Sequence, residues 1–404
     1  MVYIQREIEK DIDKWINDRE IIAIRGARQS GKTTILNKTK DKLIASGVNE
    51  KDVQYFSFED DLLRIQFEEN CLEFINHNKS NNKTYFLLDE IQYIKEVGKK
   101  IKLIFDSIEN IKLIVTGSSS FDLTNLGKYL VGRVIFLDLY PFSFQEFLKS
   151  KEEKYENLYQ KIKIDFKNPI IEKTVIINDL NLLLKEYLTY GSYPRIVLEK
   201  NTEKKKELLK NFFTTYIEKD LVSLYGNRHR DNIIKILKIL SSSNSIIKYE
   251  SLSSDSGLNY HEIKQILSLL KDSFAISIIN PFYKNLTSEL KKNPKVYFID
   301  YGIRNYLFGI DNINFDILYE NFIHNELSRN HNIKYWRTTA KTEIDFIIDD
   351  LIPLEVKTHD KITRALLSYI KQYKPRFAFV ANQNNIRKRE FQSCTIFVLP
   401  FIYF

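Results

Sequence analysis

Continuous apolar runs, each followed by polar residues and a helical pattern, recur along the first third of the chain. They include Ile21–Ile24, Tyr85–Leu88 and Leu113–Val115, and the stretch VQYFSFED at residues 53–60 supplies a further strand. Runs without alternation are typical of parallel strands buried on both faces of a sheet. The alternation of such strands with helices predicts a parallel α/β sheet with right-handed crossovers.

Helical spacing dominates the middle of the chain. The charged stretch 149–168 has no strong core pattern and predicts an extended or inserted segment, whereas residues 206–225 are amphipathic. Residues 232–282 predict two helices, a turn at Gly257, a third helix and a strand pair, which is the winged-helix pattern. The third helix carries His261, Lys264 and Lys271 without a basic cluster, so duplex binding and a purely structural role both stay open.

The carboxyl-terminal part contains a hairpin, EIDFIIDDLIPLEVK, at residues 343–357. A two-residue turn would place its two apolar sets on opposite faces. A three-residue turn at Asp349–Leu351 opposes Ile348 to Ile352 and puts both sets on one face. The same register sets Asp345 opposite Glu355. Burial of one apolar face therefore predicts that these carboxylates come together.

A candidate phosphate-binding loop follows the first strand. Gly26, Gly31, Lys32 and Thr33 fit the pattern G-x-x-x-x-G-K-[ST] between a strand and a helix. Glycines let backbone N–H groups wrap phosphate oxygens, and the helix N-terminus adds its positive dipole end. We expect Lys32 to reach the β- and γ-phosphates and the Thr33 hydroxyl to bind Mg²⁺. The predicted cofactors are ATP and Mg²⁺, and the predicted binding residues are Gly26, Ala27, Arg28, Gln29, Ser30, Gly31, Lys32, Thr33 and Thr34.

Polar residues end the other predicted strands. Asp89 is placed to hold Mg²⁺ and Glu90 to polarise the attacking water, because carboxylates at the carboxyl end of a parallel strand face the ligand crevice. Ser118, just beyond the third strand, is a candidate for contacting the γ-phosphate or the water. Arg133 is either an ordinary surface arginine or an arginine finger, and a finger would act on a neighbouring subunit and imply a homo-oligomer.

Several motifs in order resemble an archaeal and bacterial AAA+-like P-loop ATPase family: IRGARQSGKTT, LLDEIQ, TGSSSFDL, GR and LYPFSFQEF. The resemblance continues at residues 186–199, EYLTYGSYPRIVLE, which in that family belongs to helices that serve as a lid. It also extends to the segment NLTSELKKNPKVYFIDYGIRNYL, which resembles the carboxyl-terminal domain of uncharacterised function that follows these ATPases.

A second resemblance concerns the end of the chain. A helix at residues 320–330, three strands, a helix and a strand follow the core order of PD-(D/E)xK nucleases. That resemblance implies a site formed by Glu326, Asp345, Glu355 and Lys357. Carboxylates suit Mg²⁺ or Mn²⁺, and Lys357 would orient the attacking water or stabilise developing charge. The alternative is that the fold persists without cleavage.

Composition adds a few limits. The net charge of +8 arises from 61 basic and 53 acidic residues, which barely favours a DNA partner. Cys71 and Cys394 match no metal-site spacing, and a cytoplasmic, reducing compartment fits them. The amino terminus has no apolar signal core. The apolar stretch 395–404 is too short to cross a bilayer and predicts a final core strand, so no membrane partner is expected.

Together these patterns predict an α/β protein in four parts. A AAA+-like ATP-binding core at 1–148 is followed by a helical lid at 149–225, a winged-helix-like domain at 226–310 and a PD-(D/E)xK nuclease-like domain at 311–404. The predicted function is ATP hydrolysis coupled to a DNA-binding module with a candidate metal-dependent nuclease site. Two alternatives stay open. One is a nucleotide switch whose silent nuclease-like domain binds a protein partner, and the other is an ATP-dependent remodeller of proteins.

Overall fold

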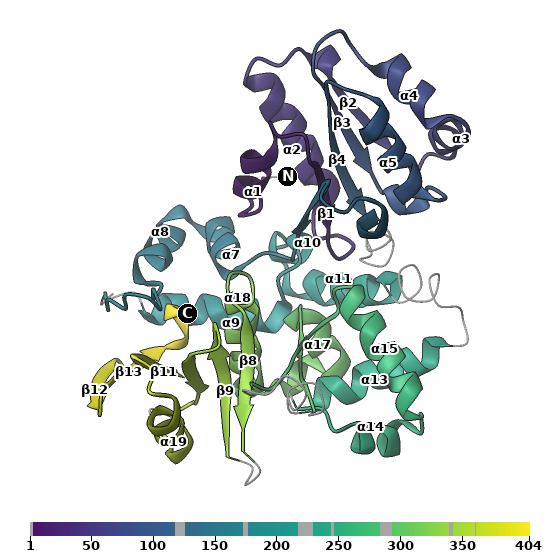
Figure 1. Ribbon diagram of the computed structural model, residues 1–404. Helices are drawn as coiled ribbons and strands as arrows, with labels where there is room; N and C mark the ends of the chain where they lie inside the picture. The colour runs from purple at the N-terminus through teal and green to yellow at the C-terminus, as the bar shows by residue number, and fades with distance from the viewer. Residues whose placement is uncertain are drawn as a thin grey trace. The chain divides into compact units, whose positions relative to one another are not determined.

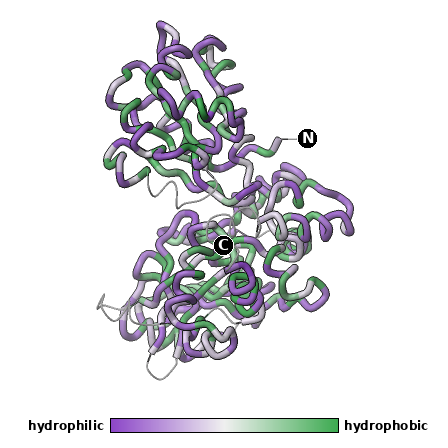
Figure 2. Tube along the Cα trace, turned by 90° about the vertical axis from the view of Figure 1, so that its right-hand side faces the viewer, coloured by the Kyte–Doolittle hydropathy of each residue, from purple (hydrophilic) through white to green (hydrophobic). Residues whose placement is uncertain are grey.

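A computed structural model describes residues 3–404 except 118–125, 173–176, 217–228, 244–245, 283–292, 339–341 and 360. The described residues form two compact units (Figure 1). One contains the residues up to Pro141 together with Asp272–Phe274, and the other contains the remaining residues from Phe142 onward. Hydrophobic segments run through the interior of each unit (Figure 2).

The first unit is built on a five-stranded sheet in which every neighbouring pair is parallel, as predicted. Across the sheet the strands are β2 (Val53–Ser57), β3 (Thr84–Asp89), β4 (Ile111–Gly117), β1 (Ile21–Arg25) and β5 (Val134–Asp138). Its helices are α1 (Glu9–Trp15), α2 (Lys32–Ala45), α3 (Asp61–Glu69), α4 (Cys71–Asn78) and α5 (Val97–Ser107), with short 3-10 turns at Glu50–Asp52 and Ile91–Tyr93.

Both faces of this sheet are covered (Figure 1). Ile22 and Ile24 pack with α1 and α2, whereas Ile21 and Ala23, which point the other way along β1, pack with α3, α4 and α5. Burial on both faces is the reason that these strands are apolar throughout instead of alternating. The carboxyl ends of the parallel strands lie at one edge, where the loop before α2 begins.

Helices make up most of the second unit before its large sheet. They are α7 (Phe144–Lys151), α8 (Glu153–Ile162), α9 (Ile177–Tyr190), α10 (Pro194–Val197), α11 (Thr202–Tyr216), α17 (Tyr301–Phe308) and α18 (Phe315–Leu327), with a 3-10 turn at Ile310–Asn312. The segment 149–168 is not extended, because α8 occupies its centre. Glu156, Tyr159 and Ile162 are buried one turn apart in α8, and the many charges around them hid this narrow apolar stripe.

A group of three helices and a strand pair forms next to α17. Helices α13 (Arg230–Ser242), α14 (Tyr249–Ser256) and α15 (Tyr260–Asp272) precede antiparallel β6 (Ile276–Ile279) and β7 (Lys295–Phe298). Gly257 ends α14 with a φ of 72°, a conformation that glycine adopts readily. Ile246, between α13 and α14, forms an isolated bridge with Lys295 of β7.

The large sheet of the second unit has six strands. In order these are β12 (Arg387–Phe391), β13 (Cys394–Pro400), β11 (Phe377–Asn382), β10 (Ile352–Val356), β9 (Glu343–Ile348) and β8 (Ile333–Arg337), and α19 (Arg364–Tyr373) joins β10 to β11. The predicted final strand is confirmed as β13, which a 3-10 turn at Phe401–Tyr403 follows. The exposed strand β12 was not predicted.

The predicted hairpin register is confirmed. Ile352 pairs with Ile348 and Leu354 with Phe346 across β9 and β10. The turn reaches this register through φ angles of 50° at Asp349 and 61° at Asp350. Aspartate tolerates the left-handed region better than most side chains do, so the turn forms without glycine.

Candidate functional site

Two glycines of the loop before α2 have definite steric roles. A Cβ at Gly26 would lie 2.2 Å from the Leu139 carbonyl oxygen, so only glycine fits there. Gly31 has a φ of 105° and stands directly before the first residue of α2. Gln29 also has a positive φ, 62°. The loop Gly26–Thr34 thus turns sharply into a helix N-terminus, the backbone arrangement that binds phosphate.

Two buried cations hold this loop. The Lys32 ammonium donates to the carbonyl oxygens of Gly26 and Ala27, each at 3.1 Å. Arg6 donates to the Ser30 carbonyl at 2.8 Å and to the Tyr140 carbonyl at 2.7 Å. Arg6 was missed in the sequence because no motif connects the segment before α1 with a loop two elements away. Its guanidinium fixes the loop from the amino-terminal side.

Asp89, at the end of β3, gathers three hydroxyl groups. The Thr33 hydroxyl donates to its Oδ2 at 2.7 Å, and the Tyr55 hydroxyl donates to the same oxygen at 3.0 Å. Thr116, at the end of β4, donates to Oδ1. Burial and then the charge of Asp89 raise the pKa of Tyr55, so its phenol stays a donor. The hard oxygens of Thr33 and Asp89 therefore meet at the strand ends and fit Mg²⁺.

Glu90 follows with a left-handed backbone, φ 55°, which turns its side chain away from the line of β3. Its N–H donates to the Thr116 hydroxyl at 3.2 Å, and its carboxylate accepts from the Gln92 amide. Glu90 is therefore anchored one residue from Asp89. Ser118, the other catalytic candidate at this edge, lies outside the described residues.

Arg133 lies just before β5 and is paired within its own unit. Its Nε is 3.0 Å from Asp106 Oδ1, and both side chains are more than one-third exposed. The guanidinium also lies over the Phe105 ring, 5.9 Å from its centroid. An exposed pair of this kind is compatible with a surface arginine and with one that changes partner in an assembly.

A second polar cluster occupies the other unit, around Lys295 of β7. The Lys295 ammonium is 2.8 Å from Glu343 Oε1, 3.0 Å from Glu320 Oε1 and 3.5 Å from Asp345 Oδ1. Its side chain is 1% exposed. Burial opposes its charge, but attraction by Glu320, Tyr297, Asp345 and Glu343 outweighs burial and raises the pKa of Lys295 well above its ordinary value.

Asp345 of β9, Glu355 of β10 and Lys357, which directly follows β10, do lie near one another, and Asp345 belongs to this cluster. Lys357 is 3.1 Å from Asp345 Oδ2, which also accepts the Val356 N–H at 2.8 Å. Glu355 accepts the Thr363 hydroxyl at 2.5 Å, and burial raises the pKa of its carboxyl to about 7. Asp345 is therefore held by cations, whereas Glu355 is held in a more apolar position.

Glu326 requires a correction. Its carboxylate is buried and accepts the Phe144 N–H at 3.0 Å. Its negative charge is close enough to Tyr187 and Tyr301 to help raise the pKa of both phenols. The helix acid that reaches the cluster is Glu320, which accepts the Tyr297 hydroxyl at 2.7 Å as well as Lys295. The two glutamates are six positions apart on α18 and so point to different sides of it. The sequence resemblance selected the wrong one.

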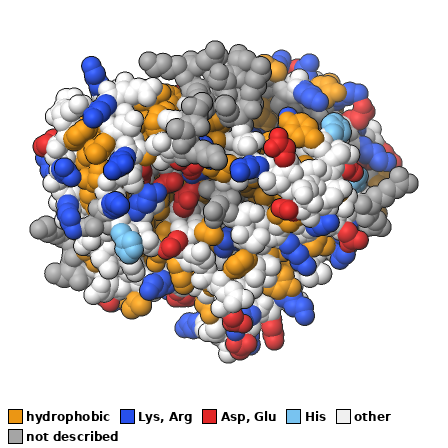
Figure 3. Space-filling view, turned by 90° about the horizontal axis from the view of Figure 1, so that it is seen from below, with side chains coloured by type: hydrophobic (Ala, Val, Ile, Leu, Met, Phe, Trp, Pro, Cys, Tyr) orange, Lys and Arg blue, Asp and Glu red, His pale blue; other side chains and the backbone are white. Residues whose placement is uncertain are grey.

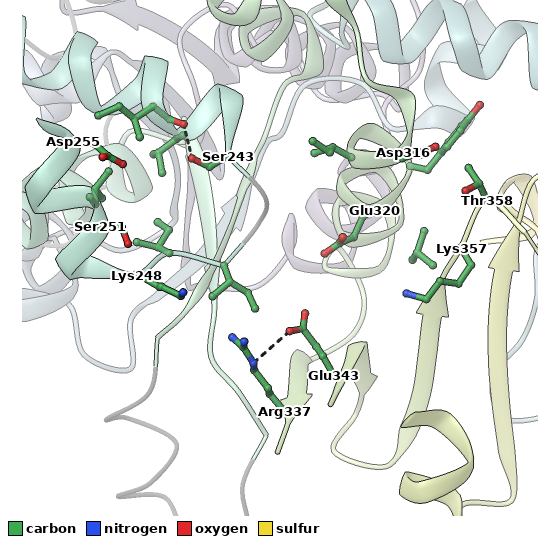
Figure 4. A pocket seen from close by; sticks show the side chains of 18 of the residues that line it. Ser243, Lys248, Ser251, Asp255, Asp316, Glu320, Arg337, Glu343, Lys357 and Thr358 are labelled. Atoms are coloured by element: carbon green, nitrogen blue, oxygen red, sulfur yellow. Dashed lines mark hydrogen bonds and ion pairs between the residues drawn. The ribbon is translucent and has the colours of Figure 1, made fainter. Parts of the chain in front are cut away.

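A cavity of about 590 Å³ opens beside this cluster. Glu320, Glu343 and Lys357 line one side, and Lys248, Ser251 and Asp255 of the α13–α14 region line another (Figure 4). Arg337 faces Glu343 across 3.7 Å. The wall of the cavity thus carries positive and negative side chains close to one another.

The metal implied by the nuclease resemblance does not fit this cluster, because an ammonium already lies among the carboxylates. Within the described residues, no group of three or more His, Cys, Asp or Glu side chains is arranged to hold a metal ion. Glu326, Asp345 and Glu355 are therefore not supported as a shared ligand set. Within the same residues, no helix is long and apolar enough to span a membrane.

Comparison with known proteins gives the family. A AAA domain model matches residues 18–148, and two models for domains of unknown function (DUF8612 and DUF4143) match residues 181–314 and 315–401. An uncharacterised protein of Haemophilus influenzae is 26% identical over 376 residues, covering 88% of this chain and 85% of that protein. The AMPPCP-bound DnaA structure from Aquifex aeolicus aligns at a TM-score of 0.33 and 14% identity, covering 67% of this chain and 90% of that one.

The amino-terminal unit is thus a P-loop ATPase fold of the AAA type. An uncharacterised protein of Methanocaldococcus jannaschii is 30% identical over 356 residues, covering 84% of this chain and 75% of that protein. The chain belongs to the same family as this archaeal protein.

Proposed function

We propose that the chain is an ATP-driven switch that hydrolyses ATP at the edge where Lys32, Thr33, Asp89 and Glu90 meet. The observation that carries this proposal is the convergence of the Thr33 hydroxyl and two further hydroxyls on Asp89. It joins the loop before α2 to the ends of β3 and β4, so nucleotide at the loop is coupled to two strands of the core.

Each residue has a role that follows from its chemistry. The Lys32 ammonium exchanges its carbonyl contacts for β- and γ-phosphate oxygens, and Thr33 with Asp89 would hold Mg²⁺. When bound there, Mg²⁺ would supply positive charge that offsets the developing phosphate charge. Glu90 accepts the proton of the attacking water, and the bond from its N–H to Thr116 keeps its backbone in place.

Phosphate release measured with Glu90→Gln and Glu96→Gln tests this role. Both glutamates have a left-handed backbone and lie in the same unit, but Glu96 is exposed and paired with Lys99. We expect Glu90→Gln to lower turnover about 100-fold while ATP still binds, because a general base contributes on that scale. Glu96→Gln should match the wild type. Equal turnover in all three proteins would remove Glu90 from the mechanism.

DNA is a second candidate partner, and the arrangement of α13, α14, α15, β6 and β7 favours it. The Ile246–Lys295 bridge adds a third strand position to the β6–β7 pair, as in winged-helix modules. The face of α15 that carries His261, Lys264 and Lys271 is exposed. On the face of the molecule in Figure 3, however, Lys and Arg are interspersed with Asp and Glu.

Duplex binding measured by fluorescence anisotropy tests this candidate. Lys264→Glu should weaken duplex binding and lower its salt dependence by about one phosphate contact, because Lys264 lies on the exposed face of α15. Lys238→Glu on α13 should leave both unchanged. Both lysines are exposed, so the two changes alter net charge equally. If both changes weaken binding equally, DNA binding depends on net charge and not on α15. If DNA leaves ATP turnover unchanged, a protein partner is favoured.

A further inference from the structure

The Lys295 ammonium lies 3.5 Å from Asp345, one of the residues that the nuclease resemblance implies as a ligand of a divalent ion. Three carboxylates from α18 and β9 surround it at 2.8–3.5 Å, and it is closed off from solvent. The ammonium donates to Glu320 at 3.0 Å, and it forms ion pairs with Glu343 at 2.8 Å and with Asp345 at 3.5 Å. Carboxylate oxygens bind Mg²⁺ at about 2.0–2.1 Å, a much tighter cage.

We propose that Lys295 is a built-in cation that replaces a divalent metal ion in this cluster, so that the carboxyl-terminal unit works without metal and does not cut phosphodiesters. The inference goes beyond the proposed ATPase and does not depend on it.

The cluster is already compensated in charge. Glu320, Glu343 and Asp345 carry three negative charges, against which stand three cations: Lys295, Lys357 at 3.1 Å from Asp345 and Arg337 at 3.7 Å from Glu343. Further donors reach the same carboxylates, because Tyr297 donates to Glu320 and the Val356 N–H donates to Asp345. A divalent ion would have to displace a tethered ammonium whose stem is buried on β7, which is costly without repacking.

Lys295 also joins two parts of the second unit. It belongs to the β6–β7 pair, whereas Glu343 and Asp345 belong to the six-stranded sheet and Glu320 to α18. A buried ion pair fixes orientation because each partner left alone would be an uncompensated charge. The cluster that resembles a cutting site thus acts as a clamp beside the 590 Å³ cavity.

Manganese binding to the full-length, nucleotide-free protein, measured by electron paramagnetic resonance, tests the proposal. Lys295→Ala should gain one Mn²⁺ site relative to the wild type, and adding Asp345→Asn should remove it. Lys112→Ala is the matched control, because Lys112 is equally buried but bonded to the carbonyls of Trp15, Asp18 and Glu20. It should gain none. A folded Lys295→Ala protein with no additional site would overturn the proposal.

A second measurement needs only proteins that keep Lys295. Asp345→Asn in the wild-type background should leave the number of bound Mn²⁺ ions unchanged, because no ion is held there. Loss of one Mn²⁺ on Asp345→Asn would overturn the proposal even if Lys295→Ala failed to fold. Mn²⁺-dependent cleavage of DNA or RNA by the wild type that Asp345→Asn abolishes would overturn it as well.

Discussion

The two units each bury a lysine among oxygen atoms, yet the oxygens differ in kind. Lys32 donates to two neutral backbone carbonyls, whereas Lys295 lies among three carboxylates. Carbonyls carry partial charges and compensate an ammonium only in part, so a phosphate can take their place. Carboxylates compensate it fully. A buried lysine is therefore available to bind a ligand in the first unit, whereas in the second unit its charge is already taken up by carboxylates.

Lys295→Met is the change for which we expect the largest loss of stability. It leaves three carboxylates without their central cation, and breaking a buried pair in this way costs about 3–5 kcal/mol. Lys112→Met removes three hydrogen bonds to carbonyls, for which we expect about 1–3 kcal/mol. Urea unfolding of both variants measures the difference. Equal losses would mean that the carboxylates gain no particular stability from Lys295.

A pH titration of stability examines the surroundings of Lys295. Burial, together with repulsion from Lys295, lowers the pKa of His324 to about 4. A hydrogen bond between the His324 ring and the Asn325 side-chain oxygen raises this pKa but does not offset burial. Below pH 6.5 the unfolded chain binds a proton at His324 that the folded chain does not, so the stability contributed by neutral His324 is complete above pH 6.5 and is lost as pH falls toward 4. The contribution of His324 that is lost over this window is on the order of 3 kcal/mol. Glu355 acts in the opposite direction, because its raised pKa of about 7 lets the folded chain bind a proton there first.

The variant His324→Gln should flatten that part of the titration, because glutamine does not titrate. Its unfolding free energy, measured from pH 7 down to pH 4, should lose less toward acid pH than that of the wild type. The exposed His261 offers a control, since His261→Gln should leave the wild-type slope in place. A slope that survives in His324→Gln would assign the acid sensitivity to other groups.

Lys32→Met reverses the pattern expected of Lys295→Met. We expect ATP turnover to fall at least about 100-fold, since the ammonium stabilises phosphate charge in the transition state. Stability should fall by about 1–3 kcal/mol, less than for Lys295→Met, because two hydrogen bonds from the ammonium to backbone carbonyls are lost. Phosphate release and urea unfolding on one preparation give both values. A large loss of stability with retained turnover would show that Lys32 is structural.

What the sequence predicts well in both units is local. The loop before α2 is a contiguous motif, and the hairpin register follows from apolar residues a few positions apart. Lys295 was not predicted because it comes from a different strand. It is separated from Glu343 by 47 residues, and no sequence periodicity connects the two. The choice of Glu326 over Glu320 failed for a related reason. A helix has several faces, and only tertiary packing decides which of them meets β9.

The smallest expected effect on stability concerns Arg133 and Asp106, the exposed pair of the first unit. Arg133→Ala should change the unfolding free energy by less than about 1 kcal/mol, because exposed ion pairs contribute little. If Arg133 acts as a finger on a neighbouring subunit, Arg133→Ala should nevertheless lower ATP turnover, and mixing it with Glu90→Gln should restore part of it. Asp106→Ala is the control, since it releases Arg133 without removing it and should retain turnover. If the mixtures are no more active than their components, Arg133 is a surface cation without a role in catalysis. It would then differ from Lys32 of the same unit, which is buried in the loop before α2.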